Sequence, residues 1–407
     1  MHSEAVLEQP QARSRPAPDS VAFVFKIAER CNLACSYCYF FFGGDESYKQ
    51  HPPFVLPSTI DGLIAFVLGS IEDHGIRNVR IGFHGGEPLL LKKARFDEMC
   101  ERLTEAIGTR CNLSLSVQTN GVLVDSEWVA LFQKYGIHAG ISFDGPPEFH
   151  NTTRITKKGR GTYAETRRGW DMLMEASREG RVPAPGVLCV VDPQQSGAAT
   201  FRHLIEELGA LHMDFLLPDV THDSPDANEE FVKGCGDYLI EICHSWFDLG
   251  RSDVHVRFID HVMGPLLDDG LMRLSAATKN DPRSIFTISS NGEISPDDAM
   301  RPLAPRFREA GLRVGHDTLG DVLAHDVWRE LMASQDALAA PCQTCTWKGI
   351  CNGGVRQHRF SEHNGFDNPS LYCSTLKRIY AYIATQLIRG GCSVDEFEKR
   401  LASCFAG

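Results

Sequence analysis

The chain has 407 residues, of which 43% are hydrophobic and 23% charged, as in ordinary globular proteins. This length suggests two or three domains. The formal net charge of −12 argues against a nucleic-acid-binding protein, which usually carries a basic surface. No apolar run reaches the length of a membrane span, and residues 1–20 lack the apolar core of a signal peptide. We therefore expect a cytoplasmic protein without nucleic-acid or membrane partners, and a flexible segment at 1–20.

Strands and helices alternate through the first half of the chain. Strands are predicted at 21–28, 79–83, 113–119, 137–143, 186–191 and 214–217. Helices are predicted between them at about 58–74, with Ser58 as N-cap, and at 92–107, 125–135, 162–178 and 199–208. This alternation indicates parallel βα units, hence a barrel or an open sheet. In a βα barrel, active sites are built where the strands end.

The second half is predicted to be helical at 227–250 and to form a hairpin at 285–295. Asn291-Gly292 in this hairpin suits a type I′ turn. Helices follow at about 374–388 and from Ser393, where Glu396 would complete a capping box.

Two tight groups stand out among the 14 cysteines. In a chain without an export signal, such grouping favours metal binding over disulfides. The first group, Cys31, Cys35 and Cys38, directly follows the first predicted strand. Three thiolates cannot complete a four-cysteine zinc site or coordinate every iron of a four-iron cluster. A cluster held this way would keep one iron open for an outside ligand.

The C-x3-C-x2-C spacing resembles the cluster motif of the radical S-adenosylmethionine (SAM) enzymes. This resemblance implies a partial (β/α)6 TIM-type barrel. It implies that the three thiolates hold a 4Fe-4S cluster and that SAM binds the fourth iron. An electron donor such as flavodoxin or ferredoxin would then drive SAM cleavage to a radical that abstracts a substrate hydrogen. A zinc knuckle is the alternative for these thiols.

Further positions match the family's SAM contacts. Gly85-Gly86-Glu87 matches a GGE motif that receives the SAM ammonium group, and Ser142 and Asp144 match a Ser-x-Asp at the end of the fourth strand. Arg154 matches an arginine that pairs with the SAM carboxylate, a task suited to a planar guanidinium. Two more residues complete the implied set of SAM contacts: Tyr37 near the adenine and Gln118 at the end of the third strand.

The second cysteine group, Cys342, Cys345, Cys351 and later Cys373, resembles the SPASM module of radical SAM enzymes that modify peptides. Four cysteines complete one auxiliary 4Fe-4S cluster, although a four-cysteine zinc site has the same ligands. Val355 and Asp297 stand where the full pattern has further cysteines. The resemblance therefore implies one auxiliary cluster in a small α+β domain. The expected division is a flexible segment, a barrel, a helical bridging region and the auxiliary domain, at 1–20, 21–225, 226–283 and 284–407.

The C-terminal tail from Cys351 to Cys373 resembles maturases that form cyclophanes in ribosomally made precursor peptides. The resulting expectation is a crosslink between an aromatic ring and the β-carbon of a nearby residue. Asp298 would be the catalytic base, and His84 would touch the peptide. An anaerobic sulfatase-type maturase, which oxidises a Cys or Ser on a protein, is the nearest alternative, but the missing cysteines weigh against it. A non-catalytic metal-binding scaffold is the second alternative.

Overall fold

The computed structural model describes residues 18–225, 227–278 and 281–403, so the predicted flexible segment 1–20 falls almost wholly outside the described part. One mixed sheet organises these residues, in the order β7-β6-β5-β4-β3-β2-β1-β8-β9. Its parallel strands are β1 (Ser20–Ala28), β2 (Asn78–Gly85), β3 (Asn112–Thr119), β4 (His138–Ser142), β5 (Gly186–Val190), β6 (His212–Leu216), β7 (His255–Val256) and β8 (Ile285–Ile288). β9 (Ile294–Ser295) is antiparallel to β8. The predicted α/β partial barrel is confirmed.

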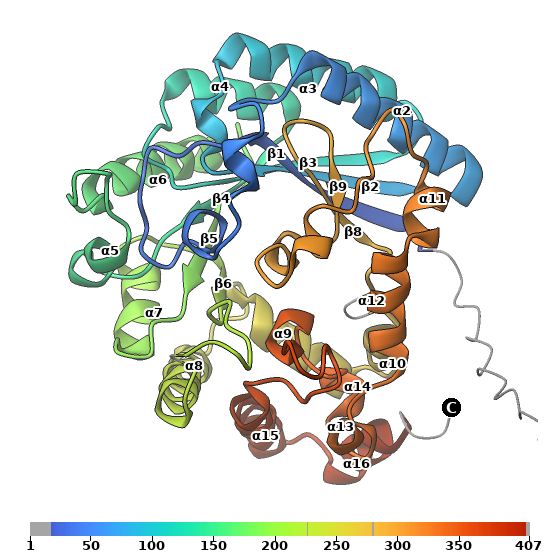
Figure 1. The fold of residues 1–407 in the computed structure, drawn as a ribbon. Coiled ribbons are helices and arrows are strands. Elements are labelled where there is room, and N and C mark those ends of the chain that lie inside the picture. The colour runs from blue at the N-terminus through green and yellow to red at the C-terminus, as the bar shows by residue number, and fades with distance from the viewer. Residues whose placement is uncertain (1–17, 226, 279–280, 404–407) are drawn as a thin grey trace, which may run out of the picture.

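Helices cover the outer face of the curved sheet (Figure 1). They are α2 (Pro57–His74), α3 (Lys93–Ile107), α4 (Ser126–Tyr135), α5 (Pro147–Thr153), α6 (Tyr163–Arg178), α7 (Gly197–Glu206) and α8 (Glu229–Leu249). The predicted Ser58 cap of α2 is wrong, because Pro57 occupies the first helical position and Leu56 precedes it without a side-chain cap. In the described residues, no helix has both the length and the apolar character that a membrane crossing requires.

Alternation along β1 separates the two faces of the sheet. Phe23 packs edge-on against Phe66 of α2, with ring centroids 6.1 Å apart, so this set of side chains faces the helices. The alternate side chains, Ala22, Val24 and Lys26, point to the inner face. Lys26 is nevertheless fully buried, which lysines rarely are unless they are paired with another group.

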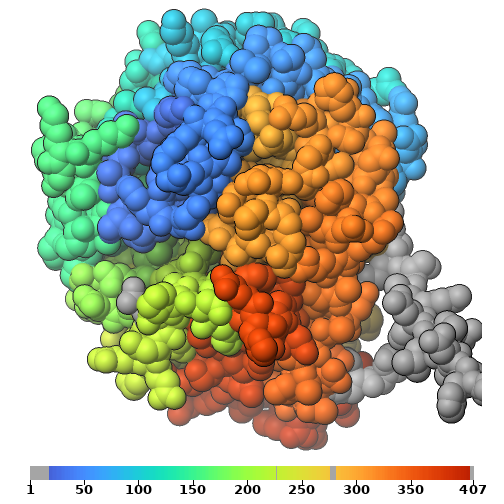
Figure 2. Space-filling model, in the orientation of Figure 1, coloured from blue at the N-terminus to red at the C-terminus, as the bar shows by residue number. Residues whose placement is uncertain are grey.

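The C-terminal part of the chain lies across the open side of the sheet, where it is coloured orange to red (Figure 1). Its helices, together with the two that precede β8, are α9 (Arg257–Leu267), α10 (Asp269–Thr278), α11 (Leu319–Ala324), α12 (Asp326–Asp336), α13 (Ala340–Gln343), α14 (Lys348–Cys351), α15 (Cys373–Arg389) and α16 (Val394–Ser403). Figure 2 shows the early segment in blue meeting orange and red residues on one face, so the front of the molecule is assembled from both ends of the chain.

The β8-β9 hairpin forms as predicted, but its turn is not type I′. A type I′ turn needs positive φ at both central residues. Gly292 has φ 91°, whereas Asn291 is not in the left-handed region. The Gly292 N–H donates to the Ser289 carbonyl at 2.9 Å, as in a three-residue loop in which glycine follows a tight turn.

Candidate active site

The loop after β1 and the loop after β2 are joined through their backbones. The Gly86 N–H donates to the Ala28 carbonyl at 2.7 Å, and the Glu87 N–H donates to the Arg30 carbonyl at 2.8 Å. A Cβ atom on Gly85, where φ is 144°, would lie 2.0 Å from the Ala28 oxygen, and one on Gly86 would lie 2.4 Å from the Arg30 oxygen. Both positions therefore require glycine, and their close contact fixes the start of the cysteine loop.

Cys31, Cys35 and Cys38 lie in this loop, between β1 and α1 (Tyr39–Phe42), half-buried and in no disulfide. The Leu33 N–H donates to the Cys31 sulfur at 3.4 Å. Burial raises the pKa of Cys31 to about 12, and the charges of Glu87 and the two neighbouring thiols act in the same direction. Three thiolates in this setting would need a bound cation to hold them deprotonated. The donor set thus fits a cationic iron–sulfur cluster held through three thiolates.

The side chains of neither cysteine group are arranged as a site for a single metal ion. Among the described residues, no three or more His, Cys, Asp or Glu side chains lie close enough together to hold one metal ion.

The Glu87 carboxylate is buried and ties two elements together. It accepts hydrogen bonds from the Leu89 N–H (3.0 Å), the Thr119 hydroxyl (2.6 Å) and the Asn120 N–H (2.8 Å). Burial raises its pKa, while these donors oppose that rise. Glu87 therefore fastens the short helix η2 (Pro88–Leu90) to the end of β3, and its predicted contact with SAM stays a prediction.

Tyr37, Asp144 and Arg154 form a second contact group. The Tyr37 hydroxyl donates to Asp144 Oδ2 at 2.5 Å, and the buried Arg154 guanidinium donates to the same hydroxyl. Arg154 lies 3.7 Å from Asp144, whose other oxygen accepts from the Val190 N–H at 3.1 Å. Burial raises the pKa of Cys35, and the Arg154 charge opposes this rise. Asp144 and Arg154, two of the predicted SAM contacts that follow β4, thus reach Tyr37 in the cysteine loop.

A cavity of about 510 Å³ lies against this group, and we call it the Asp144 cavity. Its walls include Tyr37, Asp144, Val190 and Asp219, at the carboxyl ends of β4, β5 and β6. Such a volume is ordinary for a small-molecule site. Gln118 and Ser142 do not line this cavity and are paired with each other, since the Gln118 amide donates to the Ser142 hydroxyl at 3.0 Å.

Asp298 stands at the centre of a buried polar cluster. Lys26 Nζ lies 2.9 Å from Asp298 Oδ2, and the Tyr39 hydroxyl donates to the same oxygen. His84 Nδ1 lies 3.6 Å away. The second carboxylate oxygen, Oδ1, is buried and has no hydrogen-bond partner within the described ranges. The two residues predicted to act on substrate, His84 and Asp298, therefore lie side by side.

The charges in this cluster follow from its contacts. Burial alone would raise the pKa of Asp298, but the charges of Lys26 and His84 and the hydrogen bonds from Tyr39 and Lys26 outweigh it and lower the pKa to about 2. Burial, aided by the Lys26 charge, lowers the pKa of His84 to about 4. His84 is therefore neutral at pH 7, and Lys26 and Tyr39 are what keep Asp298 ionised.

The four cysteines of the second group face a common cavity. Cys342, Cys345, Cys351 and Cys373 all line one small cavity beside Trp347 and Tyr380. Burial raises the pKa of Cys342, and the other three thiols raise it further. After Cys351 the chain turns sharply through Asn352, Gly353 and Gly354, with φ of 46°, 83° and 76°. This turn sends the chain away and lets it return to the same cavity at Cys373, the first residue of α15.

Sequence reasoning missed the partners of Asp298. Lys26 interrupts the apolar run from Val21 to Ala28 at an inward-facing position, and a lone lysine there was a signal that a buried partner exists. For Tyr39, the only signal in the sequence was its position directly after Cys38. Asp297, beside Asp298, points elsewhere and lines a different cavity on the inner face.

Comparisons with known proteins agree with this geometry. A family model described as the radical SAM superfamily matches residues 25–186. A serine-type anaerobic sulfatase-maturating enzyme of Bacteroides thetaiotaomicron is 31% identical over 373 residues, which cover 87% of this chain and 87% of that relative. The chain belongs to the anaerobic sulfatase-maturating enzyme family within the radical SAM superfamily. It is thus a radical SAM enzyme, and the family brings SAM and its iron–sulfur cluster.

Other members of the family match over similar lengths. A cysteine-type anaerobic sulfatase-maturating enzyme of Clostridium perfringens is 23% identical over 374 residues, covering 88% of this chain and 94% of the relative. The solved structure of native anSMEcpe with bound AdoMet and Cp18Cys peptide has the same fold, with a TM-score of 0.75 and 20% identity, covering 91% of this chain and 98% of the other.

These relatives overturn the predicted cyclophane-forming activity. That prediction was wrong: it rested on the resemblance of the tail from Cys351 to Cys373, and it counted the absence of cysteines at Val355 and Asp297 against the sulfatase-maturating type. Relatives that match 82–88% of this chain carry the sulfatase-maturating name. Cysteine positions in the tail fix how many clusters the chain can ligate, and not which bond of a substrate reacts.

Proposed function

We propose that this enzyme oxidises the side chain of a serine or cysteine within a protein or ribosomally made peptide. The observation that carries the proposal is the Asp298 carboxylate, held ionised by Lys26 at 2.9 Å and next to His84. It gives the site a proton acceptor at the same end of the sheet as the three cysteines. Full-length similarity to both serine-type and cysteine-type relatives supports the substrate class.

The chain offers a complete set of contacts for the cofactors. We assign Cys31, Cys35 and Cys38 to the SAM-binding cluster, and the Asp144 cavity with Tyr37 and Arg154 to SAM. When bound, SAM and its reduced cluster supply the one-electron chemistry that removes a hydrogen atom from the substrate β-carbon. The Arg154 guanidinium and the Gly85-Gly86 backbone supply fixed positive and hydrogen-bonding groups for an amino-acid moiety.

Asp298 completes the oxidation of the substrate. Conversion of a serine CH2–OH to an aldehyde removes one hydrogen atom from carbon, one electron and the hydroxyl proton. We assign that proton to Asp298. A hydroxyl on a carbon that is losing an electron becomes strongly acidic, so a carboxylate with a pKa of about 2 is a sufficient acceptor. Lys26 keeps the acceptor free of a proton before each turnover.

The remaining electron needs an acceptor, which we place at Cys342, Cys345, Cys351 and Cys373. Four thiols around one cavity complete a four-iron cluster without an open position. In this proposal, segment 21–225 binds SAM and its cluster, and segment 284–407 holds the auxiliary cluster. A flavodoxin or ferredoxin would supply the initial reducing electron.

Product analysis tests this proposal. The anaerobically reconstituted enzyme, SAM and dithionite are incubated with peptides that carry a central serine or cysteine. Loss of two hydrogens from the serine peptide, with an aldehyde trapped by a hydrazide reagent, is the expected result. Serine and cysteine peptides that remain unchanged, while SAM is cleaved, would overturn the proposed reaction.

A further inference from the structure

The inner face of the sheet is hollow rather than packed. Inward positions of a closed βα barrel are filled by bulky branched side chains. Here the inward residues of β1, β2 and β3 include Ala22, Gly82, Ser114 and Ser116. A Cβ atom on Gly82 would meet nothing nearer than the Ser116 hydroxyl at 3.4 Å, so protein packing does not require glycine there. Small side chains therefore leave open space in front of the strands.

Two cavities follow one another along this face. The His84 cavity, of about 510 Å³, is lined by Val24, Gly82, His84 and Ser116, among others. The Arg80 cavity, of about 760 Å³, lies at the amino ends of the same strands and includes Ala22, Arg80 and Ser114. Successive inward residues of each strand thus belong first to one cavity and then to the other. The two cavities therefore extend along the inner face from the amino ends of the strands to His84, which lies beside Asp298.

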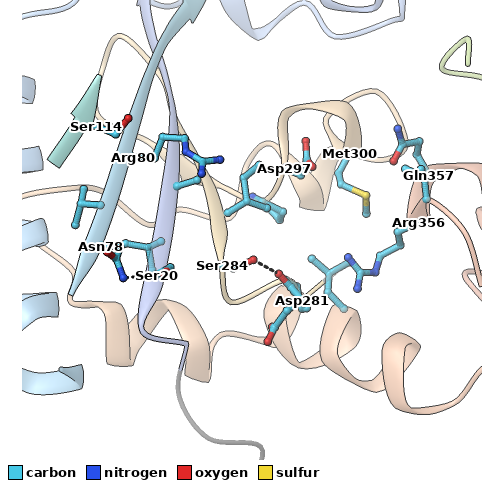
Figure 3. Close-up of a pocket in the computed structure, with 18 of the residues that line it drawn as sticks. Ser20, Asn78, Arg80, Ser114, Asp281, Ser284, Asp297, Met300, Arg356 and Gln357 are labelled. Atoms are coloured by element: carbon cyan, nitrogen blue, oxygen red, sulfur yellow. Dashed lines mark hydrogen bonds between the residues drawn. The ribbon is translucent and has the colours of Figure 1, made fainter. Parts of the chain in front are cut away.

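Arg80 extends from β2 into the larger cavity, with Asp297, Met300 and Arg356 on the opposite side (Figure 3). Its strand neighbours are Ala22 and Ser114, which are too short to reach a guanidinium. Within the described ranges the Arg80 guanidinium has neither an ion pair nor a hydrogen bond. Arg80 is exposed to solvent in this cavity, so its five N–H donors are open to a ligand that enters it.

The other charged groups of this cavity are already engaged. Asp281 accepts two hydrogen bonds from Arg283 Nε and Nη2, at 3.0 and 2.7 Å. Asp297 accepts from the Ala299 N–H at 3.2 Å, and Arg356 donates to the Ser334 hydroxyl at 3.1 Å. Arg80 is therefore the group with unused donors, and the charge that complements it is negative.

We propose that the substrate peptide lies along this inner face and that Arg80 binds an acidic side chain of the peptide. The inference rests on the proposed function in requiring a peptide substrate, and it adds a specificity-determining residue. Arg80 and His84 are four residues apart on one face of β2, which corresponds to about 13 Å. An extended peptide covers the same length in about four residues, so the acidic residue stands three to five positions from the oxidised one.

Binding of matched peptides tests the proposal. We would use fluorescently labelled 13-residue peptides with a central serine. Each peptide carries one Glu, placed three, four or five positions before or after the serine, and its other residues are neutral. Matched peptides carry Gln or Lys at that position. Dissociation constants are measured by fluorescence anisotropy with reconstituted wild-type enzyme, Arg80→Gln and Arg80→Glu. Arg77→Gln is the control, because Arg77 stands just before β2 with a side chain 78% exposed to solvent.

The expected result is that Glu at one of these positions tightens binding about tenfold or more over Gln, as charge-assisted hydrogen bonds do. Arg80→Gln should reduce this preference to less than about twofold, Arg80→Glu should favour Lys, and Arg77→Gln should match wild type. A wild-type preference below about twofold, or one that survives in Arg80→Gln, would overturn the proposal. Because anisotropy reads binding alone, peptides that bind with the expected preference but are not oxidised would count against the proposed function and not against Arg80.

Discussion

Lys26 and Asp298 stand 272 positions apart in the chain, and their side chains meet at 2.9 Å with no more than 7% of either exposed. One comes from near the carboxyl end of β1 and the other from the short helix η3 (Asp298–Met300) after the β8-β9 hairpin. Their contact therefore depends on β8 joining the sheet beside β1. The pair links the fold of the C-terminal segment directly to the charge state of the proposed proton acceptor.

Replacing Lys26 with Met should leave the Asp298 carboxylate buried without its cation. Breaking a buried ion pair by removing one partner costs about 3–5 kcal/mol, and we expect a loss of unfolding free energy in this range. Denaturant unfolding measures the loss. In the double variant Lys26→Met/Asp298→Asn much of the stability should return, because no buried charge remains. Equal losses in the single and double variants would contradict the assigned pairing.

Gly86→Ala should disrupt the SAM-binding cluster. The added methyl group would lie 2.4 Å from the Arg30 carbonyl oxygen and would push the cysteine loop away from β2. Reconstituted protein should then bind about four iron atoms per chain where the parent binds about eight, the content of two four-iron clusters. Gly69→Ala is the matched control, since nothing lies within 4 Å of its added Cβ atom. That variant should keep its iron and gain up to about 1 kcal/mol of helix stability.

Cys373→Ser should remove the auxiliary cluster alone. Iron content should fall by about half, while SAM cleavage without peptide persists, because the first cluster keeps its three thiolates. Cys392→Ser, which changes a half-buried thiol outside both groups, should leave the iron content unchanged. Metal analysis that finds zinc at this site in place of iron would refute the proposed electron acceptor.

His51 should make the enzyme less stable at alkaline pH. Burial alone would lower its pKa, but hydrogen bonds and charges from Glu29 and Glu293 outweigh burial and raise the pKa to about 9. A histidine pKa raised by folding contributes stability that is complete below pH 6.5 and is lost as the pH rises through 9. His51→Gln should therefore flatten the fall in melting temperature between pH 6.5 and 9. His244→Gln, on the exposed side of α8, should keep the parent's profile.

The barrel could be predicted from sequence because its signals are local. The apolar runs and the helical segments between them repeat at a spacing that only parallel βα units satisfy, and most predicted boundaries fall within two residues of the observed ones. The cysteine spacings likewise predicted that Cys342, Cys345, Cys351 and Cys373 form one group, and these four thiols do line one cavity. Contacts between neighbouring strand ends, such as the hydrogen bond from the Asn120 N–H to Glu87, follow from the same strand order.

The contacts that tune the site could not be predicted, because they join distant segments. No pattern in sequence pairs Lys26 with Asp298, or shows that Arg80 faces an open cavity while Gly82 beside it leaves space. The hairpin turn differed because Asn291 keeps a negative φ and Gly292 alone takes the left-handed conformation. The choice of reaction failed for a different reason, since the tail cysteines report cluster ligation and carry no information on the substrate bond.

The role of Asp298 as the proton acceptor is tested by following one hydrogen and one proton of the substrate. A peptide with a serine deuterated at its β-carbon is incubated with parent enzyme and with Asp298→Asn, and both the deuterium in 5′-deoxyadenosine and the aldehyde are measured. The parent should transfer deuterium and form aldehyde in equal amounts. Asp298→Asn should still transfer deuterium but form aldehyde at least about 100-fold more slowly, as the loss of a proton acceptor implies. Undiminished aldehyde formation by Asp298→Asn, or no deuterium transfer by the parent, would contradict the account.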